Sequence, residues 1–467
     1  MTQFIIGIII LVVGYFTYGK VVDRHFGSDE NITTPAHALK DGVDYIPMSK
    51  GRVFLVQLLN IAGLGPIFGA VQGALFGPMA FVWIALGSVF AGGVHDYFSG
   101  MLSVRHEGKS ISEITGIYLG NKARSVMRVF SVVLLILVGT VFMTGPAGLL
   151  TDLGFFGIEN YNIWLAIIFA YYFLATIMPV DQIIGKIYPL FGLSLLIMAA
   201  GIGFKMLTGD YTLPAFTVYS MHPGGYPVWA MLFTTIACGA ISGFHATQSP
   251  MMARCMENEN QGRQIFYGSM IAEGIIAMIW AAAAMSFFGG TEGLYQAFNN
   301  GGAAGVVNSI SINMLGTVGG ILAMIGVIAA PITSGDTAFR SARLTIADAM
   351  GFEQTSIKNR LALALPLFTV CFGLTRMDFQ VIWRYFSWSN QTLAMIVLWT
   401  SAAFLVKNKK SHYMASLPAM FMTAVSITYI MQAPEGFSLP NSISTPVGII
   451  GAVVTMIVFM NYSRKNK

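Results

Sequence analysis

Charged residues are scarce in this sequence. Asp, Glu, Lys and Arg make up only 10% of its 467 residues, whereas soluble globular domains carry about 25%. Hydrophobic residues make up 55%, and the mean hydropathy is +0.67. This composition excludes an ordinary soluble domain and indicates an all-α, polytopic membrane protein. The pI near 9.0 then reflects charges at membrane edges, so we expect the lipid bilayer as a partner and no nucleic acid.

Cysteines and enzyme motifs are also scarce. The three cysteines, Cys238, Cys255 and Cys371, lie in or beside apolar stretches without a CxxC spacing, which argues against zinc, a redox pair or a disulfide framework. The chain has no Walker phosphate loop, no GxSxG and no HExxH. We therefore expect no enzyme activity and no cofactor. The apolar N-terminus has no preceding basic residue and no A-x-A site, which predicts a retained first span.

In contrast, long apolar stretches are abundant in the sequence. A spanning helix needs roughly 20 such residues, and 13 candidates lie at residues 3–19, 52–77, 79–100, 126–144, 162–179, 187–206, 228–253, 264–288, 316–337, 361–376, 381–406, 413–432 and 444–462. If the chain crosses at each, all but three of its 26 Lys and Arg residues fall on one face; the exceptions are Lys205, Arg376 and Arg384. The positive-inside rule makes that face cytoplasmic. We expect a plasma (inner) membrane protein with the N-terminus outside and the C-terminus inside.

The segments without Lys or Arg complete this topology. They are residues 145–161, 207–227, 289–315 and 433–443, and we expect them to be outer loops.

The span at 52–77 is interrupted near its middle by Gly63-Leu64-Gly65-Pro66. Pro66 has no N–H to donate, so one helix should end near Ala62 and a second should begin at Pro66. An unwound backbone is tolerated in a membrane only where it is buried in protein or lines a cavity. The alternative is that glycine and proline merely kink the helix.

The span at 228–253 is interrupted in the same way. Gly239, Gly243 and Pro250 break its apolar run around Ser242 and His245. Two interrupted spans in corresponding places of two halves point to a transporter binding site. The second half-helices, beginning near Pro66 and Phe244, would aim their positive dipole ends at the midplane, which favours an anionic or zwitterionic small-molecule substrate.

The two interrupted spans are five spans apart and therefore run in opposite directions. This spacing predicts a 5+5 inverted repeat. We expect an accessory first helix and cytoplasmic loop at 1–51, a first repeat at 52–225, a second at 226–411, and two C-terminal helices with a basic tail at 412–467.

Six segments resemble the carbon-starvation protein family of CstA-like transporters. They are DGVDYIP (41–47), IAGLGPIFG (61–69), GVHDYFS (93–99), IACGAISGFHA (236–246), SGDTAFRSAR (334–343) and SNQTLA (389–394). The resemblance implies a secondary transporter of the LeuT-like amino acid–polyamine–cation architecture, linked to uptake of peptides or pyruvate during carbon starvation. The chain departs from the family pattern in being short and in having Val56-Gln57 where longer members carry a histidine pair. Glutamine, unlike histidine, cannot titrate.

Four polar residues within spans are candidates for ion coupling. Glu273 lies near mid-depth of an apolar helix, where a carboxylate is functional by default; the alternative is a protonated glutamate that ties helices together. Thr333 and Ser334 could offer oxygens to Na⁺ across from the first break, although such hydroxyls also bond to their own helix. Asp336 could take part, or pair with Arg340 four residues on. We leave the choice between H⁺ and Na⁺ open.

The remaining candidates concern substrate binding. His245 could contact a carboxylate or titrate, and Trp388, Asn390 and Gln391 could supply an apolar wall and amide groups, or simply link helices. His95 and Asp96 are expected at the cytoplasmic membrane interface without a function. The predicted substrate-binding set is Ala62, Gly63, Leu64, Gly65, Pro66, Gly239, Ser242, Gly243, His245, Trp388, Asn390 and Gln391.

These observations favour a secondary active transporter that imports a small carboxylate-bearing nutrient by alternating access coupled to an ion gradient. The alternatives are a membrane nutrient sensor on a transporter fold and a passive channel. A sensor would need a partner for its output, and a channel would need a continuous polar pore.

Overall fold

The computed structural model describes residues 1–42, 45–177, 184–354 and 356–466. All regular elements of these residues are helical, and an isolated bridge joins Met48 to Met256. The predicted all-α class is therefore confirmed. Residues 43–44 of the segment 41–47, the last two residues of the predicted span 162–179, and Lys467 lie outside the described residues.

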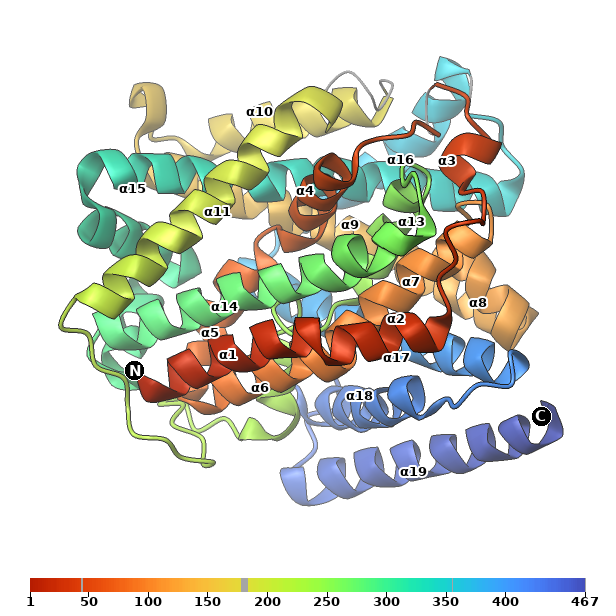
Figure 1. Ribbon diagram of the computed structural model, residues 1–467. Coiled ribbons are helices and arrows are strands. Elements are labelled where there is room, and N and C mark those ends of the chain that lie inside the picture. Colours follow the sequence, from red (N-terminus) through yellow and green to blue (C-terminus); the bar gives the residue numbers. More distant parts are fainter. Residues whose placement is uncertain (43–44, 178–183, 355, 467) are drawn as a thin grey trace.

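The helices of the first half, including short η turns of π or 3₁₀ type, are α1 (Thr2–Phe16), α2 (Tyr18–Phe26), α3 (Pro35–Ala38), α4 (Lys50–Ala62), η1 (Gly65–Gly69), α5 (Ala70–Gly73), η2 (Ala74–Phe76), α6 (Met79–Gly87), η3 (Ser88–Gly92), α7 (Gly93–Arg105), α8 (Ile111–Leu119), α9 (Asn121–Asp152), η4 (Phe155–Gly157), α10 (Tyr161–Ile177) and α11 (Ile184–Thr208). Those of the second half are η6 (Val228–Leu232), α12 (Phe233–Thr235), α13 (Gly243–Ala253), η7 (Glu259–Gln261), η8 (Arg263–Tyr267), α14 (Gly268–Phe287), α15 (Thr291–Met350), α16 (Ile357–Leu374), α17 (Phe379–Lys407), α18 (Tyr413–Gln432) and α19 (Asn441–Asn466). Figure 1 shows the long helices as a bundle with the chain termini at opposite ends.

Within the described residues, nine helices are long and apolar enough to cross a membrane, or ten if the bent pair Lys50–Ala62 and Gly65–Phe76 counts as one span. The predicted spans 381–406 and 413–432 agree with α17 and α18 to within two residues. Their clear boundaries follow from Asp378, which accepts the Gln380 N–H at the start of α17, and from the polar junction between the two helices.

One predicted loop is wrong. The expected outer loop at 289–315 is largely helical, because α15 begins at Thr291 and changes direction through non-helical backbone at Gly302 and Gly316. The predicted interruption of the span 228–253 is present: residues 236–242, which include Gly239, contain no helix, and Trp229 and Ala230 are also non-helical. Gly302 and Gly316, both at positive φ, allow the turns of α15 without loss of its helical flanks.

Helix α14 lies in the core and contacts α1, α4, α6 and η1. Its side chains are buried nearly all round, which explains its apolar sequence. Helix α1 packs on this core through two small residues: Gly7 lies against Met278, and Gly14 lies against Val89. Helices α1 and α19 expose most of their apolar residues, so they are peripheral elements facing the lipid.

Candidate functional site

The first break is present where Pro66 predicts it. Helix α4 ends at Ala62, the chain resumes as η1 at Gly65, and the two parts are bent by 54°. Gly63 has φ of 39°, and a side chain there would collide with the Phe142 ring. Leu64 continues the chain between them and is fully buried. The unwound backbone is therefore enclosed by protein, as the membrane requires.

The second break is held open by Asn390 of α17. Its Oδ1 accepts hydrogen bonds from the Phe244 N–H at 2.7 Å and from the Ser242 hydroxyl at 3.0 Å. These contacts satisfy a backbone donor in the first turn of α13, which a helix cannot satisfy by itself. Asn390 thus links two helices through hydrogen bonds. This is the role that the sequence predicted as the alternative to substrate contact. Gly243 is required here because a Cβ would lie 2.5 Å from the backbone carbonyl oxygen of Asn390.

Side chains from other helices donate hydrogen bonds to backbone carbonyl groups that precede α13. Trp83 Nε1 donates to the Ile236 carbonyl at 3.1 Å, and the Ser88 hydroxyl donates to the Gly239 carbonyl at 3.1 Å. Gln391 Nε2 donates to the Phe233 carbonyl at 2.8 Å. The non-helical segment is consequently a defined structure in which side chains pair the Ile236 and Gly239 carbonyls, and not a frayed helix.

The two breaks contact each other at the centre of the protein. Gly65 lies so close to Cys238 that a side chain at Gly65 would overlap the Cys238 side chain. A Cβ at Gly239 would lie 3.7 Å from Pro66 Cα and 2.6 Å from the Ala277 side chain. The sequence-predicted residues of both breaks therefore form one contiguous region beside α14.

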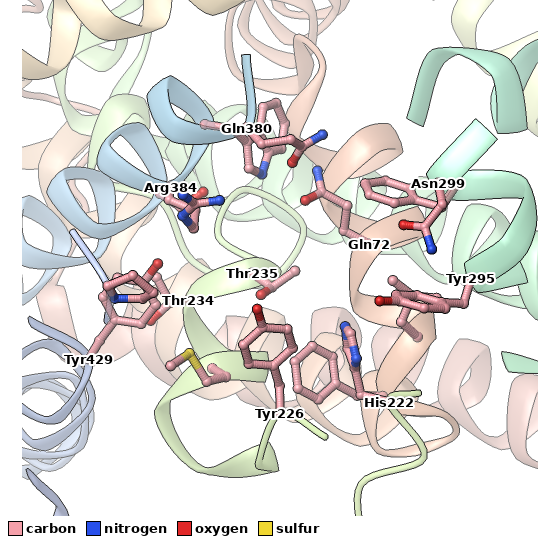
Figure 2. A pocket seen from close by; sticks show the side chains of 17 residues that line it. Gln72, His222, Tyr226, Thr234, Thr235, Tyr295, Asn299, Gln380, Arg384 and Tyr429 are labelled. Atoms are coloured by element: carbon pink, nitrogen blue, oxygen red, sulfur yellow. The ribbon is translucent and has the colours of Figure 1, made fainter. Parts of the chain in front are cut away.

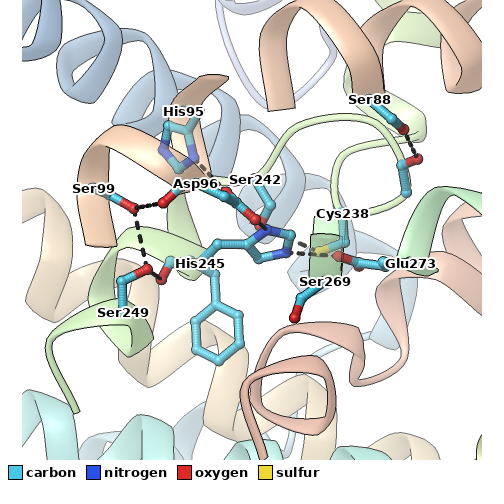
Figure 3. A network of polar contacts seen from close by, with 12 residues as sticks. Ser88, His95, Asp96, Ser99, Cys238, Ser242, His245, Ser249, Ser269 and Glu273 are labelled. Atoms are coloured by element: carbon cyan, nitrogen blue, oxygen red, sulfur yellow. Dashed lines mark hydrogen bonds and ion pairs between the residues drawn. The ribbon is translucent and has the colours of Figure 1, made fainter. Parts of the chain in front are cut away.

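A chain of four buried ionisable side chains adjoins this region (Figure 3). His95 Nδ1 lies 2.7 Å from Asp96 Oδ1, and Asp96 Oδ2 lies 2.8 Å from His245 Nδ1. His245 Nε2 lies 3.3 Å from Glu273 Oε2, as a close contact outside hydrogen-bond geometry. All four side chains have no exposed surface. The chain joins α7 to α13 and α14.

The expectation for His95 and Asp96 is wrong. Both residues are fully buried and do not reach the membrane interface, because α13 packs along α7 and places His245 next to Asp96. The ring of His245 also lies beside Cys238 and Ser242 of the second break (Figure 3). Ser249 of α13 and Ser99 of α7 share a hydrogen bond of 3.1 Å. Asp96 is the main functional candidate that the sequence reasoning missed.

The contact with Asp96 can determine which ring nitrogen of His245 carries the proton. If the Asp96 carboxylate accepts the N–H at Nδ1, the lone pair of His245 is at Nε2 and faces Glu273. Cys238 Sγ, His245 Nε2 and a Glu273 oxygen lie within 4.8 Å of one another, and they are donor types that divalent transition metals accept. The arrangement can thus exchange protons between carboxyl and imidazole groups or receive a cation.

Two further amides near the first break lack partners. Gln57 and Asn60 on α4 are fully buried, and the side-chain nitrogen and oxygen of each form no hydrogen bond among the described residues. Unpaired buried amides are costly, so they mark a position where water or a ligand group would be stabilised. Asn60 carries no motif of its own, and only its position one turn before Gly63 could have pointed to it.

The hydroxyls predicted for Na⁺ lie against the other side of the first break. Ser334 Oγ donates to the Leu59 carbonyl at 2.8 Å and also lies 3.0 Å from the Ala330 carbonyl. Thr333 Oγ1 donates to the Ala330 carbonyl at 2.7 Å. These contacts bring α15 to the end of α4.

Asp336 and Trp388 lie apart from the break centre. Asp336 Oδ1 lies 4.0 Å from Arg340 Nη2, one helical turn on, which matches the expected i,i+4 pair. The Trp388 indole donates to the Ser426 carbonyl of α18 at 3.1 Å. The structure therefore brings Trp388 to the α17–α18 interface.

Solved structures of transporters share this fold. A structure of Mhp1, a nucleobase-cation-symport-1 family transporter, in a closed conformation with bromovinylhydantoin bound, matches with a TM-score of 0.56 at 16% identity, covering 89% of this chain and 92% of Mhp1. MhsT in complex with L-phenylalanine matches with a TM-score of 0.56 at 15% identity, covering 88% of this chain and 98% of MhsT. At these identities the similarity establishes a shared fold alone.

Sequence relatives include both unnamed and named membrane proteins. An uncharacterized membrane protein of Haemophilus influenzae is 42% identical over 64% of this chain and 95% of its own length. The peptide transporter CstA of Escherichia coli is 24% identical over 90% of this chain and 79% of its own length. The CstA of Campylobacter jejuni is 28% identical, and this chain covers about half of it (52%).

The model of the carbon starvation protein CstA family matches residues 1–155 and 152–303. This match covers well over half of the chain and includes both breaks, His95, Asp96, His245 and Glu273. The protein is therefore a multi-pass membrane protein that belongs to the carbon starvation protein CstA family.

Proposed function

We propose that this protein is a secondary active transporter that imports a small carboxylate-bearing nutrient by alternating access. The observation that carries the proposal is the contact between two unwound helix breaks beside a fully buried chain of ionisable groups. Half-helix ends and mid-membrane carboxylates are the parts from which secondary transporters build substrate and ion sites. Relatives named peptide transporter CstA support peptides as the substrate class, and a pyruvate-like acid is the smaller alternative.

The proposed topology has 13 crossings. To the nine long helices and the bent pair at 50–76 we add α10, the broken stretch 228–253, and the last part of α15 after Gly316. With the N-terminus outside and the C-terminus cytoplasmic, α4 to α11 form the first repeat and η6 to α17 the second. The opposite placement of the termini in the bundle supports an odd number of crossings (Figure 1).

The proposed substrate site is the break centre. Its backbone comes from residues 62–66 and from Gly239, Ser242 and Gly243, with His245 at its edge. The unpaired amides of Gln57 and Asn60 would supply hydrogen bonds to a ligand there. The Asn390 and Gln391 amides hold the second break in the shape that receives the substrate.

The proposed driving ion is H⁺, with Glu273 as the coupling group. A mid-membrane carboxyl group is stable when neutral and can release its proton when an access state admits water. His245, held by Asp96, is the adjacent proton acceptor. Na⁺ near Thr333, Ser334 and Asp336 is the alternative, because α15 hydroxyls and α4 carbonyls meet there.

Uptake by the purified protein in proteoliposomes tests this function. Labelled alanylphenylalanine and labelled pyruvate are supplied outside, and each ion gradient is imposed separately. Accumulation above the outside concentration under one gradient supports the transporter. Entry that stops at equal concentrations under both gradients would indicate a channel, and no entry would favour a sensor.

A further inference from the structure

A second polar site lies at the side of the protein where the segments without Lys or Arg meet. A cavity of about 330 Å³ is lined by α5, α12 and α17, by His222 and Tyr226 of the segment before η6, and by Pro434 after α18. The polar side chains form a ring around it (Figure 2). Gln72 follows the first break and Thr235 precedes the second, so the cavity borders both half-helices.

Hydrogen-bond donors without partners line this cavity. The indole nitrogen of Trp383, the hydroxyls of Thr234 and Ser387, and the amide nitrogen of Gln72 are buried and form no hydrogen bond with any described residue. The side chains of Thr234, Trp383 and Ser387 belong to residues no more than 2% exposed. An indole N–H can only donate, and an amide NH₂ can only donate. Such a set needs an acceptor ligand to be satisfied.

Arg384 brings a guanidinium group to the cavity, where it forms an ion pair with Glu435. Its Nε donates to Glu435 Oε2 at 3.1 Å, while the other Glu435 oxygen accepts the Tyr429 hydroxyl at 2.7 Å. This orientation leaves both terminal nitrogens of Arg384 without a hydrogen bond to any described residue, and no Asp or Glu is among the described residues that line the cavity. A guanidinium with two such nitrogens is suited to a bidentate contact with a carboxylate.

His222 does not add a second charge near neutral pH. Its ring lies 4.8 Å from the Phe76 ring and 4.9 Å from the Tyr226 ring, and burial lowers the pKa of His222 to about 4. The imidazole is neutral above that pKa. Arg384 is then the cation that a ligand meets, and the aromatic rings provide an apolar wall.

We infer that this cavity binds the carboxylate of a peptide-sized ligand through Arg384, with Gln72 and Trp383 as further donors. Its volume is at the low end of the ~300–1,000 Å³ of small-molecule sites and exceeds what a three-carbon acid fills. The further inference that this cavity is the entry site for transport rests on the proposed function. The inference that it binds a carboxylate does not.

The test is direct binding to the full-length protein in detergent, with alanylphenylalanine and its C-terminal amide as probes. The two differ only in the carboxylate. We expect the acid to bind at least about thirtyfold more tightly than the amide, and Arg384→Gln to remove this preference. Arg376→Gln is the matched control, because Arg376 is an exposed arginine that lies over the Phe372 ring and does not line the cavity.

Trp383→Phe keeps an aromatic side chain and removes the unpaired donor together with the five-membered ring, so it provides a second readout if Arg384→Gln is unstable. We expect acid binding to the folded variant to weaken about fivefold. Equal binding of acid and amide by the wild type, absence of saturable binding of the acid, or unchanged binding by both variants would overturn the inference. Binding without uptake would refute only the proposed function, and uptake of a peptide whose binding does not depend on Arg384 would refute only this inference.

Discussion

Asp96 Oδ2 lies 2.8 Å from Nδ1 of His245, although 149 residues separate the two in the sequence. The other Asp96 oxygen contacts His95, so one carboxylate holds two buried imidazoles. This relationship fixes which His245 nitrogen faces Glu273, and the coupling proposal depends on it.

The first prediction therefore concerns Asp96→Asn. An amide has one acceptor and one donor end, so one of the two histidines would face an N–H in place of an oxygen. We expect gradient-driven uptake to fall on the order of 100-fold, and the free energy of unfolding to fall by about 1–3 kcal/mol. Ser99→Ala is the control, because its hydroxyl bonds the Asp96 backbone carbonyl at 3.0 Å and not the carboxylate. Uptake by Asp96→Asn at the level of this control would contradict the proposed role of Asp96 in orienting His245.

The second prediction concerns the contact between the breaks. Gly65→Ala adds one methyl group where the Cys238 side chain lies, and it should abolish uptake while the protein stays in the membrane. Gly65→Leu and Gly243→Leu should do the same, since a Cβ at Gly243 would lie 2.6 Å from Ala394 N. Gly148→Ala has no neighbour within 4 Å and should be silent. Near-normal uptake by all three break variants would show that the breaks are ordinary kinks.

The first break could be read from the sequence because its cause is local. Pro66 lacks an N–H wherever it stands, and Gly63 can take a φ that other residues avoid. Asp96 could not be found in this way, since its burial and its partner His245 depend on the packing of α13 against α7. Its neighbours in sequence resemble those of any polar pair near a helix end.

The misjudged segment 289–315 has a different cause. Its run Asn299-Asn300-Gly301-Gly302 reads as a loop by composition, but only Gly302 and, further on, Gly316 leave the helical region. The composition indicates where a chain can turn, and the packing of the folded protein determines where it turns. The hydrogen-bond donors of the cavity could not be predicted from the sequence for the same reason. The side-chain nitrogens of Trp383 and Gln72 lack partners only because of how the helices pack in the fold.

The third prediction tests the proposed topology with single cysteines. Cys238, Cys255 and Cys371 are buried, so they should not interfere with labelling of intact cells. A cysteine at exposed Asn300 should react with an impermeant thiol reagent from outside, and one at exposed Asn408, next to Lys409, should react only after the membrane is opened. The reverse pattern would contradict the orientation.

The fourth prediction separates Na⁺ from H⁺ as the driving ion. With proton coupling, Thr333→Val should accumulate substrate within about twofold of wild type under a pH gradient in Na⁺-free buffer, because the hydroxyl, which donates to the Ala330 carbonyl, is then not an ion ligand. A sodium carrier would behave differently. Wild type would then need Na⁺ for uptake, and Thr333→Val would need more of it.

The most direct test of coupling at the break centre is uptake by Glu273→Gln under a pH gradient alone. Glutamine keeps the shape of the neutral acid but cannot titrate, so substrate exchange across the membrane should survive while gradient-driven accumulation is lost. Glu292→Gln, an exposed carboxylate at the start of α15, is the control and should accumulate like wild type. Accumulation by Glu273→Gln equal to wild type under the pH gradient would contradict the proposed coupling role of this carboxylate.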